Sequence, residues 1–390
     1  MNKHRLRFTA IFLISMTLLP ALGQEEKVAS LSAKGYLKFL QTGLIPNTDA
    51  EVMYDNLIHN RLIIKWFPGP RLNAGIEMRN RFFYGDFVKK IPGYSNLIDM
   101  NKGYFNASGI LVKDSSYILH SAIDRAYLDL IFGKFQIRAG RQRINWSQNL
   151  IWNPNDVFNA YSFFDFDYEE RPGVDAIRVQ YYPGMTSSAE MVYEIGNKIE
   201  NTSLAGLYRF NRGGFDYQFL GGYVKDDWAL GTGWSGNIGG AAFRGELTWF
   251  YSNNDTLSRR SNFVGAISGD YTFKNKLYLH LAILYNNNGS VSKAPFSQNL
   301  FFNNLSAKNL TPARTELLAQ LTYPMTPLVN SGLSTIVNPF DHSFFIGPSL
   351  SISLMNNLEL LITGQFFAGP DGTQYGNIGN LLYWRIKWSF

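Results

Sequence analysis

The feature of this sequence that most constrains its fold is an alternation of polar and apolar residues with a period of two. In the segment 72–82, Ala74 and Ile76 fall on one face, while Glu77 and Arg79 fall on the other. Successive side chains of a strand point to opposite sides, so this pattern predicts strands with one apolar and one polar face. The pattern begins near residue 33 and recurs along the chain, for example at 215–223, 243–251, 277–285, 358–366 and 382–390.

Aromatic residues make up 15% of the chain, and their placement distinguishes a soluble sheet from a membrane-embedded one. They gather at the ends of the apolar faces, as Trp66, Trp249 and Trp388 do. Girdles of aromatic residues at both interfaces are typical of transmembrane barrels. We therefore predict an all-β fold, a transmembrane antiparallel β-barrel of the bacterial outer-membrane type. The alternative, a secreted β-sandwich or β-helix, would need a partner core to cover these apolar faces.

Turn sequences set the number of strands. They occur at eight places, 68–70, 132–134, 183–184, 211–214, 236–240, 274–276, 323–327 and 355–357. Longer connections are expected near 85–118, 145–172, 286–312 and 369–379. This spacing predicts about 18 strands, an even number as in single-chain bacterial barrels, and a barrel wide enough for an aqueous channel. We expect residues 24–390 to form one barrel domain.

The first 23 residues have the pattern of a secretory signal peptide. A basic start with Lys3 and Arg5 precedes an apolar run over 8–22, and Ala-Leu-Gly at 21–23 supplies a small-residue cleavage pattern. A retained membrane anchor is the alternative, but the run is shorter than the roughly 20 residues that span a bilayer. The segment therefore predicts export, and together with the barrel it predicts the outer membrane. The chain contains no cysteine, so we expect its stability to come from a hydrogen-bonded framework.

The polar strand faces carry an excess of basic residues in one part of the chain. The predicted pore-lining residues are His59, Arg61, Lys65, Arg79, Arg81, Arg125, Arg138, Arg178, Arg385 and Lys387. Rings of arginine and lysine favour anions, and a low-dielectric wall focuses their field. The alternative is that many of them brace the wall by pairing with acids such as Glu77. The alternation breaks around Arg141 and Arg143, so neither is assigned to a face.

The connection at 145–172 combines aromatic residues with carboxylates. Its acidic residues are Asp156, Asp165, Asp167, Glu169 and Glu170. We predict that it folds inward as a constriction facing the arginine wall. A solvated surface cap is one alternative. A calcium site is another, because carboxylate clusters bind hard cations, although the spacing matches no established calcium loop.

Three motifs in this region carry a resemblance to a known family. They are GRQRINW at 140–146, IWNPND at 151–156 and EERPGVDA at 169–176. Together they resemble the alginate-export-type porins. The resemblance implies an 18-stranded monomeric barrel in the outer membrane, with an arginine-lined channel for an anionic polysaccharide.

These features predict a passive outer-membrane channel for small or extended polar solutes, favouring anionic or polyhydroxylated ones. The alternatives are a non-transporting scaffold subunit and a lipolytic enzyme using Ser268 and His280. We assign no catalytic residue, metal or cofactor. The expected partners are the bilayer and outer-membrane lipids, polar or anionic solutes or oligosaccharides and, in the scaffold interpretation, other outer-membrane proteins. Nucleic acid is not expected, because the net charge of +6 comes from dispersed basic residues.

Overall fold

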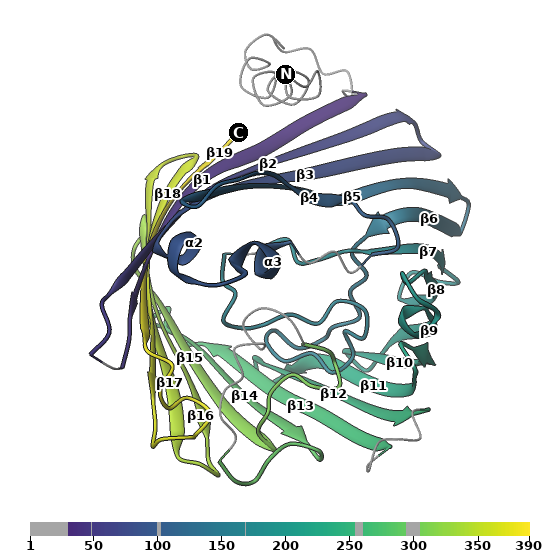
Figure 1. Cartoon of the computed structure of the whole chain (residues 1–390). Helices are drawn as coiled ribbons and strands as arrows, with labels where there is room; N and C mark the ends of the chain where they lie inside the picture. The colour runs from purple at the N-terminus through teal and green to yellow at the C-terminus, as the bar shows by residue number, and fades with distance from the viewer. Residues whose placement is uncertain (1–29, 48, 100–102, 168, 254–259, 294–304) are drawn as a thin grey trace, which may run out of the picture.

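The computed structural model describes residues 30–47, 49–99, 103–167, 169–253, 260–293 and 305–390. The predicted signal peptide at 1–23 lies outside these residues. Almost all of the regular structure belongs to one antiparallel sheet of nineteen strands, which curls into a ring when viewed along its axis (Figure 1). No helix in the described ranges is long and apolar enough to cross a membrane.

Eighteen of the strands follow one another around the closed barrel, which confirms the predicted fold class and strand number. In chain order they are β1 (Leu31–Ile45), β2 (Met53–Gly69), β3 (Leu72–Gly85), β5 (Tyr117–Phe132), β6 (Phe135–Gln142), β7 (Val174–Tyr181), β8 (Ser187–Glu194), β9 (Ser203–Arg212), β10 (Phe215–Val224), β11 (Asp227–Ile238), β12 (Ala241–Ser252), β13 (Ser261–Thr272), β14 (Tyr278–Asn286), β15 (Thr315–Thr326), β16 (Val329–Asn338), β17 (Ser343–Met355), β18 (Leu358–Ala368) and β19 (Asn380–Ser389). Short turns join the hairpins at all eight predicted places.

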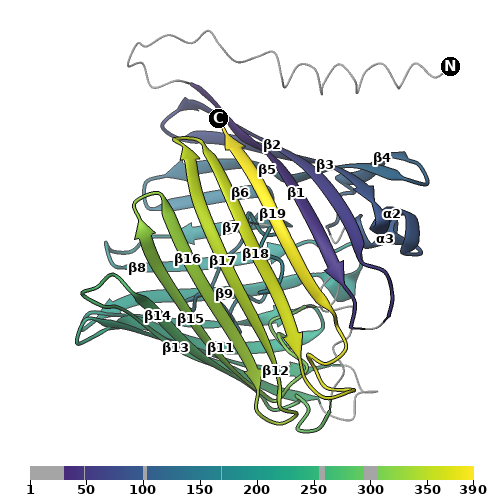
Figure 2. The same cartoon turned by 90° about the vertical axis from the view of Figure 1, so that its left-hand side faces the viewer.

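The barrel closes where β1 pairs with β19, in a register that runs from Tyr36 opposite Ser389 to Ile45 opposite Asn380. The two strands lie side by side in Figure 2. Gly35 and Phe390 exchange two backbone hydrogen bonds of 2.9 Å each at one end of this seam. A side chain on Gly35 would meet the carbonyl oxygen of Arg61 and the Phe390 ring, so the seam requires glycine there. Closure leaves no free sheet edge, as a membrane-spanning sheet requires.

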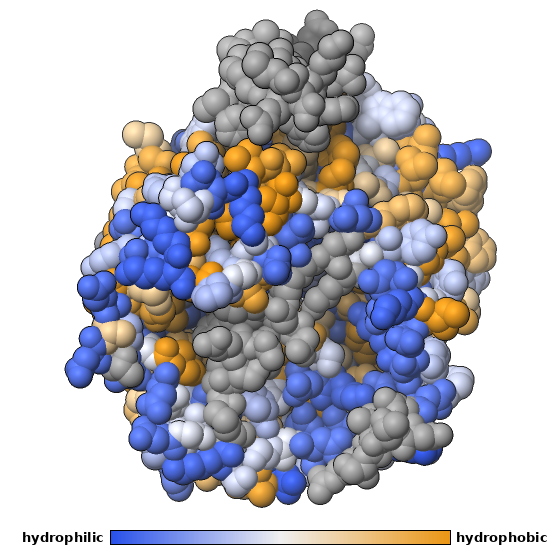
Figure 3. All heavy atoms as spheres, viewed as in Figure 1, coloured by the Kyte–Doolittle hydropathy of each residue, from blue (hydrophilic) through white to orange (hydrophobic). Residues whose placement is uncertain are grey.

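The period of two places apolar side chains outside the barrel and polar ones inside. On β12, Trp249 and Tyr251 are 36% and 37% exposed, whereas Glu246 and Thr248 are completely buried. In Figure 3, hydrophobic residues gather along the upper and right-hand periphery, while the end facing the viewer carries many hydrophilic ones. The sheet therefore presents an apolar outer surface that suits lipid and a polar interior.

The connection between β3 and β5 has structure of its own. It forms two short helices, α2 (Asp86–Lys90) and α3 (Tyr94–Ile98), and the extra strand β4 (Ser108–Lys113). Strand β4 pairs with the start of β5, ahead of the part of β5 that pairs with β6. A short 3-10 helix, η1 (Ile199–Asn201), lies between β8 and β9. The expected connection at 286–312 falls partly outside the described residues, since 294–304 are not described.

Candidate functional site

The connection between β6 and β7, residues 143–173, folds into the barrel and runs along its inner wall (Figure 1). We call it the internal loop. Its first part is anchored by large apolar side chains, of which Ile144 and Trp146 are completely buried and Trp152 is 5% exposed. The Trp146 indole donates to Glu190 Oε1 of β8 at 2.6 Å. The surface-cap alternative is therefore wrong for this part of the loop, because its side chains pack against inward-facing wall residues.

A single buried carboxylate on β12 holds three backbone positions of the internal loop. Glu246 accepts hydrogen bonds from the backbone N–H groups of Gln148, Asn149 and Asn155, the last two at 2.7 and 2.9 Å. Its side chain is completely excluded from solvent. Three N–H donors satisfy a carboxylate that would otherwise be costly to bury.

Neutral hydrogen bonds complete the attachment of this first half. Gln218 of β10 donates to the Trp146 carbonyl at 2.7 Å, and Thr248 of β12 donates to Asn155 Oδ1 at 2.6 Å. Ser268 of β13 donates to Asn149 Oδ1 at 2.7 Å. Residues 144–159 are thereby fixed to the wall between β8 and β13.

The loop then crosses to the opposite side through aromatic contacts. The Phe164 ring packs edge-on against Phe345 of β17, with centroids 5.1 Å apart, and lies 5.6 Å from Phe367 of β18. Gln365 of β18 donates to the Phe164 carbonyl at 2.9 Å. These contacts direct the following acidic residues toward β19, β1 and β2.

The second half of the loop carries charge pairs. Asp167 lies 2.8 Å from Lys38 Nζ of β1 and 3.6 Å from both the His59 ring of β2 and Arg385 of β19. Burial opposes ionisation of Asp167, but the neighbouring His59 ring and Lys38 ammonium outweigh burial and hold its pKa below the usual value. Asp167 is therefore anionic at neutral pH.

The next two acidic positions continue this pattern. Glu169 pairs with Arg385 at 3.1 Å and with Lys387 at 2.7 Å. Glu170 Oε1 lies 3.6 Å from Arg61 Nε. Three of the five predicted acidic residues therefore face the predicted basic wall at ion-pair distance.

Asp156 departs from the predicted arrangement. It is completely buried, and it follows Asn155, which is attached to β12 on the opposite wall. Burial raises its pKa to about 7, against the opposing effect of the nearby Arg143. Asp156 therefore does not face the set of paired basic residues. Asp165 is exposed inside the barrel, in the field of Arg79 and other arginines.

The most buried of the predicted basic residues, Arg61, has three acidic partners. Its guanidinium contacts Asp124 at 2.5 Å and Glu77 at 2.6 Å, in addition to the more distant Glu170. The sequence pattern missed Asp124, because a β-bulge between β3 and β5 breaks the alternation there. The extra residue lets Asp124 and Arg125 both lie buried in the wall, 6% exposed each.

Most of the other predicted basic residues also have partners. Arg79 lies 3.3 Å from Asp124, Arg138 lies 2.8 Å from Asp129, and Arg178 lies 2.6 Å from Glu190. Arg125 donates to the carbonyls of Glu170 and Arg171, and Arg81 donates to the Ile98 carbonyl and contacts His120. Lys65 is half-buried on β2. Bracing is thus the observed role for much of this wall.

Two arginines at the ends of the internal loop differ from the braced ones. Arg143 and Arg171 have no carboxylate within 4.0 Å among the described residues. The Arg171 guanidinium lies 3.1 Å from the centroid of the Tyr161 ring. Both are half-buried. Arg141, by contrast, is bound to Asp175 through two contacts of 2.8 Å.

The chemistry of an enzyme or a metal centre finds little support in the side-chain arrangement. Ser268 donates to Asn149, and His280 Nδ1 meets Gln320 Oε1 at 3.1 Å, so the hydrogen bonds of these two side chains lead to other residues. Within the described part of the chain, no group of three or more His, Asp or Glu side chains is placed to hold a metal ion. Three carboxylates of the calcium alternative, Asp167, Glu169 and Glu170, instead meet lysine and arginine.

Comparison with solved structures defines the class of fold. The chain is similar to Acinetobacter baumannii OccAB4, with 10% identity, a TM-score of 0.62 and coverage of 93% of this chain and 98% of that one. It is similar to the outer membrane protein OprD from Pseudomonas aeruginosa, with 8% identity, a TM-score of 0.60 and coverage of 93% of each chain. A BenF-like porin from Pseudomonas fluorescens Pf-5 gives 10% identity and a TM-score of 0.56, covering 93% and 99%.

The fold is therefore that of 18-stranded outer-membrane porins. No protein-family model matches the sequence, and neither does any curated protein. The comparisons do not support the alginate-export-type family that the motifs suggested. At this level of identity they define the fold, and the function has to be argued from the site.

Proposed function

We propose that this protein is a passive, solute-selective channel of the bacterial outer membrane. The closed barrel supplies the transmembrane wall, and the internal loop narrows the space inside it. The chain offers no energy-coupling motif, so we expect flux down a concentration gradient.

The observation that carries the proposed selectivity is the contrast between paired and unpaired arginines. Arg61, Arg138, Arg178 and Arg385 are neutralised by carboxylates at 2.5–3.1 Å and add little net charge to the pathway. Arg143 and Arg171 have no such partner, so their charge is available to a solute. We therefore propose a preference for anionic or polyhydroxylated solutes that rests on these two residues more than on the whole arginine wall.

Reversal potentials across a potassium chloride gradient test this proposal. The purified full chain in a planar bilayer should conduct with anion preference, and replacing Arg143 and Arg171 together by glutamine should reduce that preference. Arg212→Gln is the matched control, because Arg212 is exposed at the end of β9, next to a short turn. Cation preference of the unmodified chain would contradict the selectivity. Absence of conductance would favour the scaffold interpretation.

The substrate class suggested by the motifs can be examined in the same recordings. An anionic polysaccharide such as alginate is proposed here only from the motif resemblance. Alginate oligomers should then block the current more strongly than neutral oligosaccharides of equal length. Equal block by both would leave a channel without this specificity. Release of fatty acid from phospholipid vesicles by the purified protein would instead support the lipolytic alternative.

A further inference from the structure

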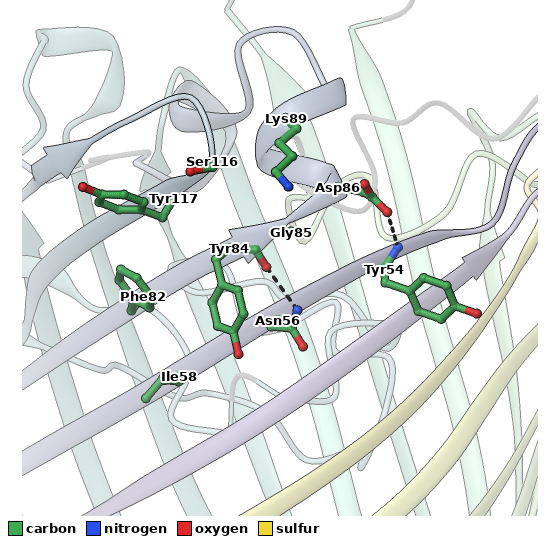
Figure 4. Close-up of a pocket in the computed structure, with 10 residues that line it drawn as sticks. All are labelled: Tyr54, Asn56, Ile58, Phe82, Tyr84, Gly85, Asp86, Lys89, Ser116 and Tyr117. Atoms are coloured by element: carbon green, nitrogen blue, oxygen red, sulfur yellow. Dashed lines mark hydrogen bonds between the residues drawn. The ribbon is translucent and has the colours of Figure 1, made fainter.

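A groove on the outside of the barrel, away from the internal loop, has the composition of a ligand site. It has a volume of about 770 Å³ and lies over β2, β3 and β5 (Figure 4). Ile58, Phe82, Tyr84 and Tyr117 form an apolar and aromatic lining, and Asp86 and Lys89 of α2 are its charged residues.

The groove opens toward lipid and not toward the channel. Tyr54 is 55% exposed and Ile58 and Tyr117 are each 37% exposed, whereas the adjacent His59 and Ile118 are 2% exposed. Because successive strand residues point to opposite sides, the exposed set faces outward. The lining residues therefore belong to the membrane-facing surface.

The position of the groove along the strands corresponds to the outer membrane–water boundary. Tyr54 follows the start of β2, Tyr84 precedes the end of β3, and Tyr117 begins β5. All three lie at the barrel end that carries the long connections, which is the extracellular end in bacterial barrels. Tyrosine is enriched at this depth, where its ring contacts acyl chains and its hydroxyl contacts water.

Helix α2 holds the cation in place above this lining. The Tyr54 backbone N–H donates to Asp86 Oδ2 at 2.9 Å, and Phe87 and Val88 pack against the cluster around Phe83 on the inner side. The Lys90 ammonium pairs with the two acidic groups near this helix, lying 3.6 Å from Asp86 Oδ1 and 3.5 Å from Glu51 Oε2. Lys89 is exposed and has no carboxylate within 4.0 Å among the described residues.

We infer that this groove binds a phosphorylated glycolipid of the outer leaflet. An acyl chain would lie along Ile58, Phe82 and Tyr84, and a headgroup phosphate would lie at Lys89. Asp86 accepts from the Tyr54 N–H and lies near Lys90, so Lys89 is the lining charge that a phosphate would meet. The order from apolar lining to cation follows the order from acyl chain to phosphate across the leaflet. This inference is separate from the proposed channel activity, because the groove and the internal loop lie on opposite sides of the wall.

Native mass spectrometry of the detergent-solubilised full chain with added lipid A tests the inference. The unmodified protein should retain a lipid A adduct, and Lys89→Gln should weaken binding about five-fold, the effect expected for one lysine at an anionic surface. Lys274→Gln is the matched control, because Lys274 is exposed at a short turn at the other end of the barrel. Channel conductance should be unchanged in both variants, so failure of this inference is distinguishable from failure of the proposed function.

Two further ligands separate the contributions of phosphate and chain. Dephosphorylated lipid A should bind the unmodified protein as weakly as lipid A binds Lys89→Gln, and inorganic phosphate alone should not form an adduct. Equal binding of phosphorylated and dephosphorylated lipid A, or equal loss in Lys89→Gln and Lys274→Gln, would overturn the inference. An adduct formed by inorganic phosphate alone would also overturn it, because the apolar lining would then have no part.

Discussion

The two halves of the internal loop are attached to the barrel by different chemistry. Residues 144–159 are held by buried aromatic side chains and by hydrogen bonds to their backbone, with Glu246 at the centre. Residues 165–167 and 169–171 are held by pairs between carboxylates and the Lys38, Arg61 and Arg385 side chains. The first half therefore depends on desolvated backbone hydrogen bonds, and the second half depends on charge.

This difference teaches how a basic wall can be present without being a strongly basic pathway. The acidic residues of the second half of the loop pair with Arg61, Arg385 and Lys38 of the wall, so fewer positive charges remain available to a solute. A count of basic residues in the sequence overstates the available positive charge for this reason.

The largest effect is expected from removing Arg61, the most buried basic residue that pairs with the second half of the internal loop, which we call the ionic half. Arg61→Met should destabilise the barrel by about 3–5 kcal/mol, because Asp124 and Glu77 would remain buried or half-buried without their main cation. Denaturant unfolding in detergent micelles, followed by heat-modifiable migration in gels, measures this change. Arg212→Met provides the control at an exposed position, and a loss no greater than that of the control would contradict the interpretation.

A smaller and more local effect is expected in the first half of the internal loop, residues 144–159. Glu246→Leu should leave three buried N–H groups without an acceptor, at a local cost of about 2–3 kcal/mol. Hydrogen exchange at Asn149 and Asn155 should then be roughly 30- to 150-fold faster, which is the same free energy expressed as a rate. Glu246→Gln keeps one acceptor oxygen, so its exchange rates should lie between those of the unmodified protein and those of Glu246→Leu. Unchanged exchange in Glu246→Leu would mean that the aromatic contacts alone hold this half.

The smallest effect is expected from mild acid. A carboxylate whose pKa is lower in the folded state than in the unfolded state stabilises the fold. This stabilisation is complete at pH values above the unfolded-state pKa, and it is lost as the pH falls through the folded-state pKa. Because the pKa of Asp167 is lowered, the ionic half should hold from pH 7 to 5 and loosen only below about pH 4. Hydrogen exchange of the backbone amides of residues 165–167, 169 and 170, corrected for intrinsic rates, measures this loosening. Asp167→Asn should show faster exchange already at pH 7, and release of the unmodified loop at pH 5 would refute the expected order.

The fold was largely predictable from sequence because alternation reports directly on which side of a strand a residue lies. The same rule could have identified Lys38, which shares the inward face of β1 with Tyr36. It could not identify Asp124, because a bulge shifts the alternation within β5 and leaves no mark in composition. The alternation also could not predict which wall residues the internal loop contacts. Which carboxylate meets which arginine depends on the path of a loop whose contacts reach more than 200 residues along the chain.

The seam between β1 and β19 has a consequence for how the barrel is completed. Every other pair of neighbouring strands is close in sequence, whereas the Gln41–Trp384 hydrogen bond joins residues 343 positions apart. Loop-closure entropy grows with the logarithm of length, so joining these ends costs roughly 2 kcal/mol more than closing a 30-residue connection. Hairpins can therefore add one after another at little entropic cost, and we expect the seam to form last. The tight approach of Phe390 to Gly35 then makes closure the step at which a small change in side-chain volume decides whether the barrel completes.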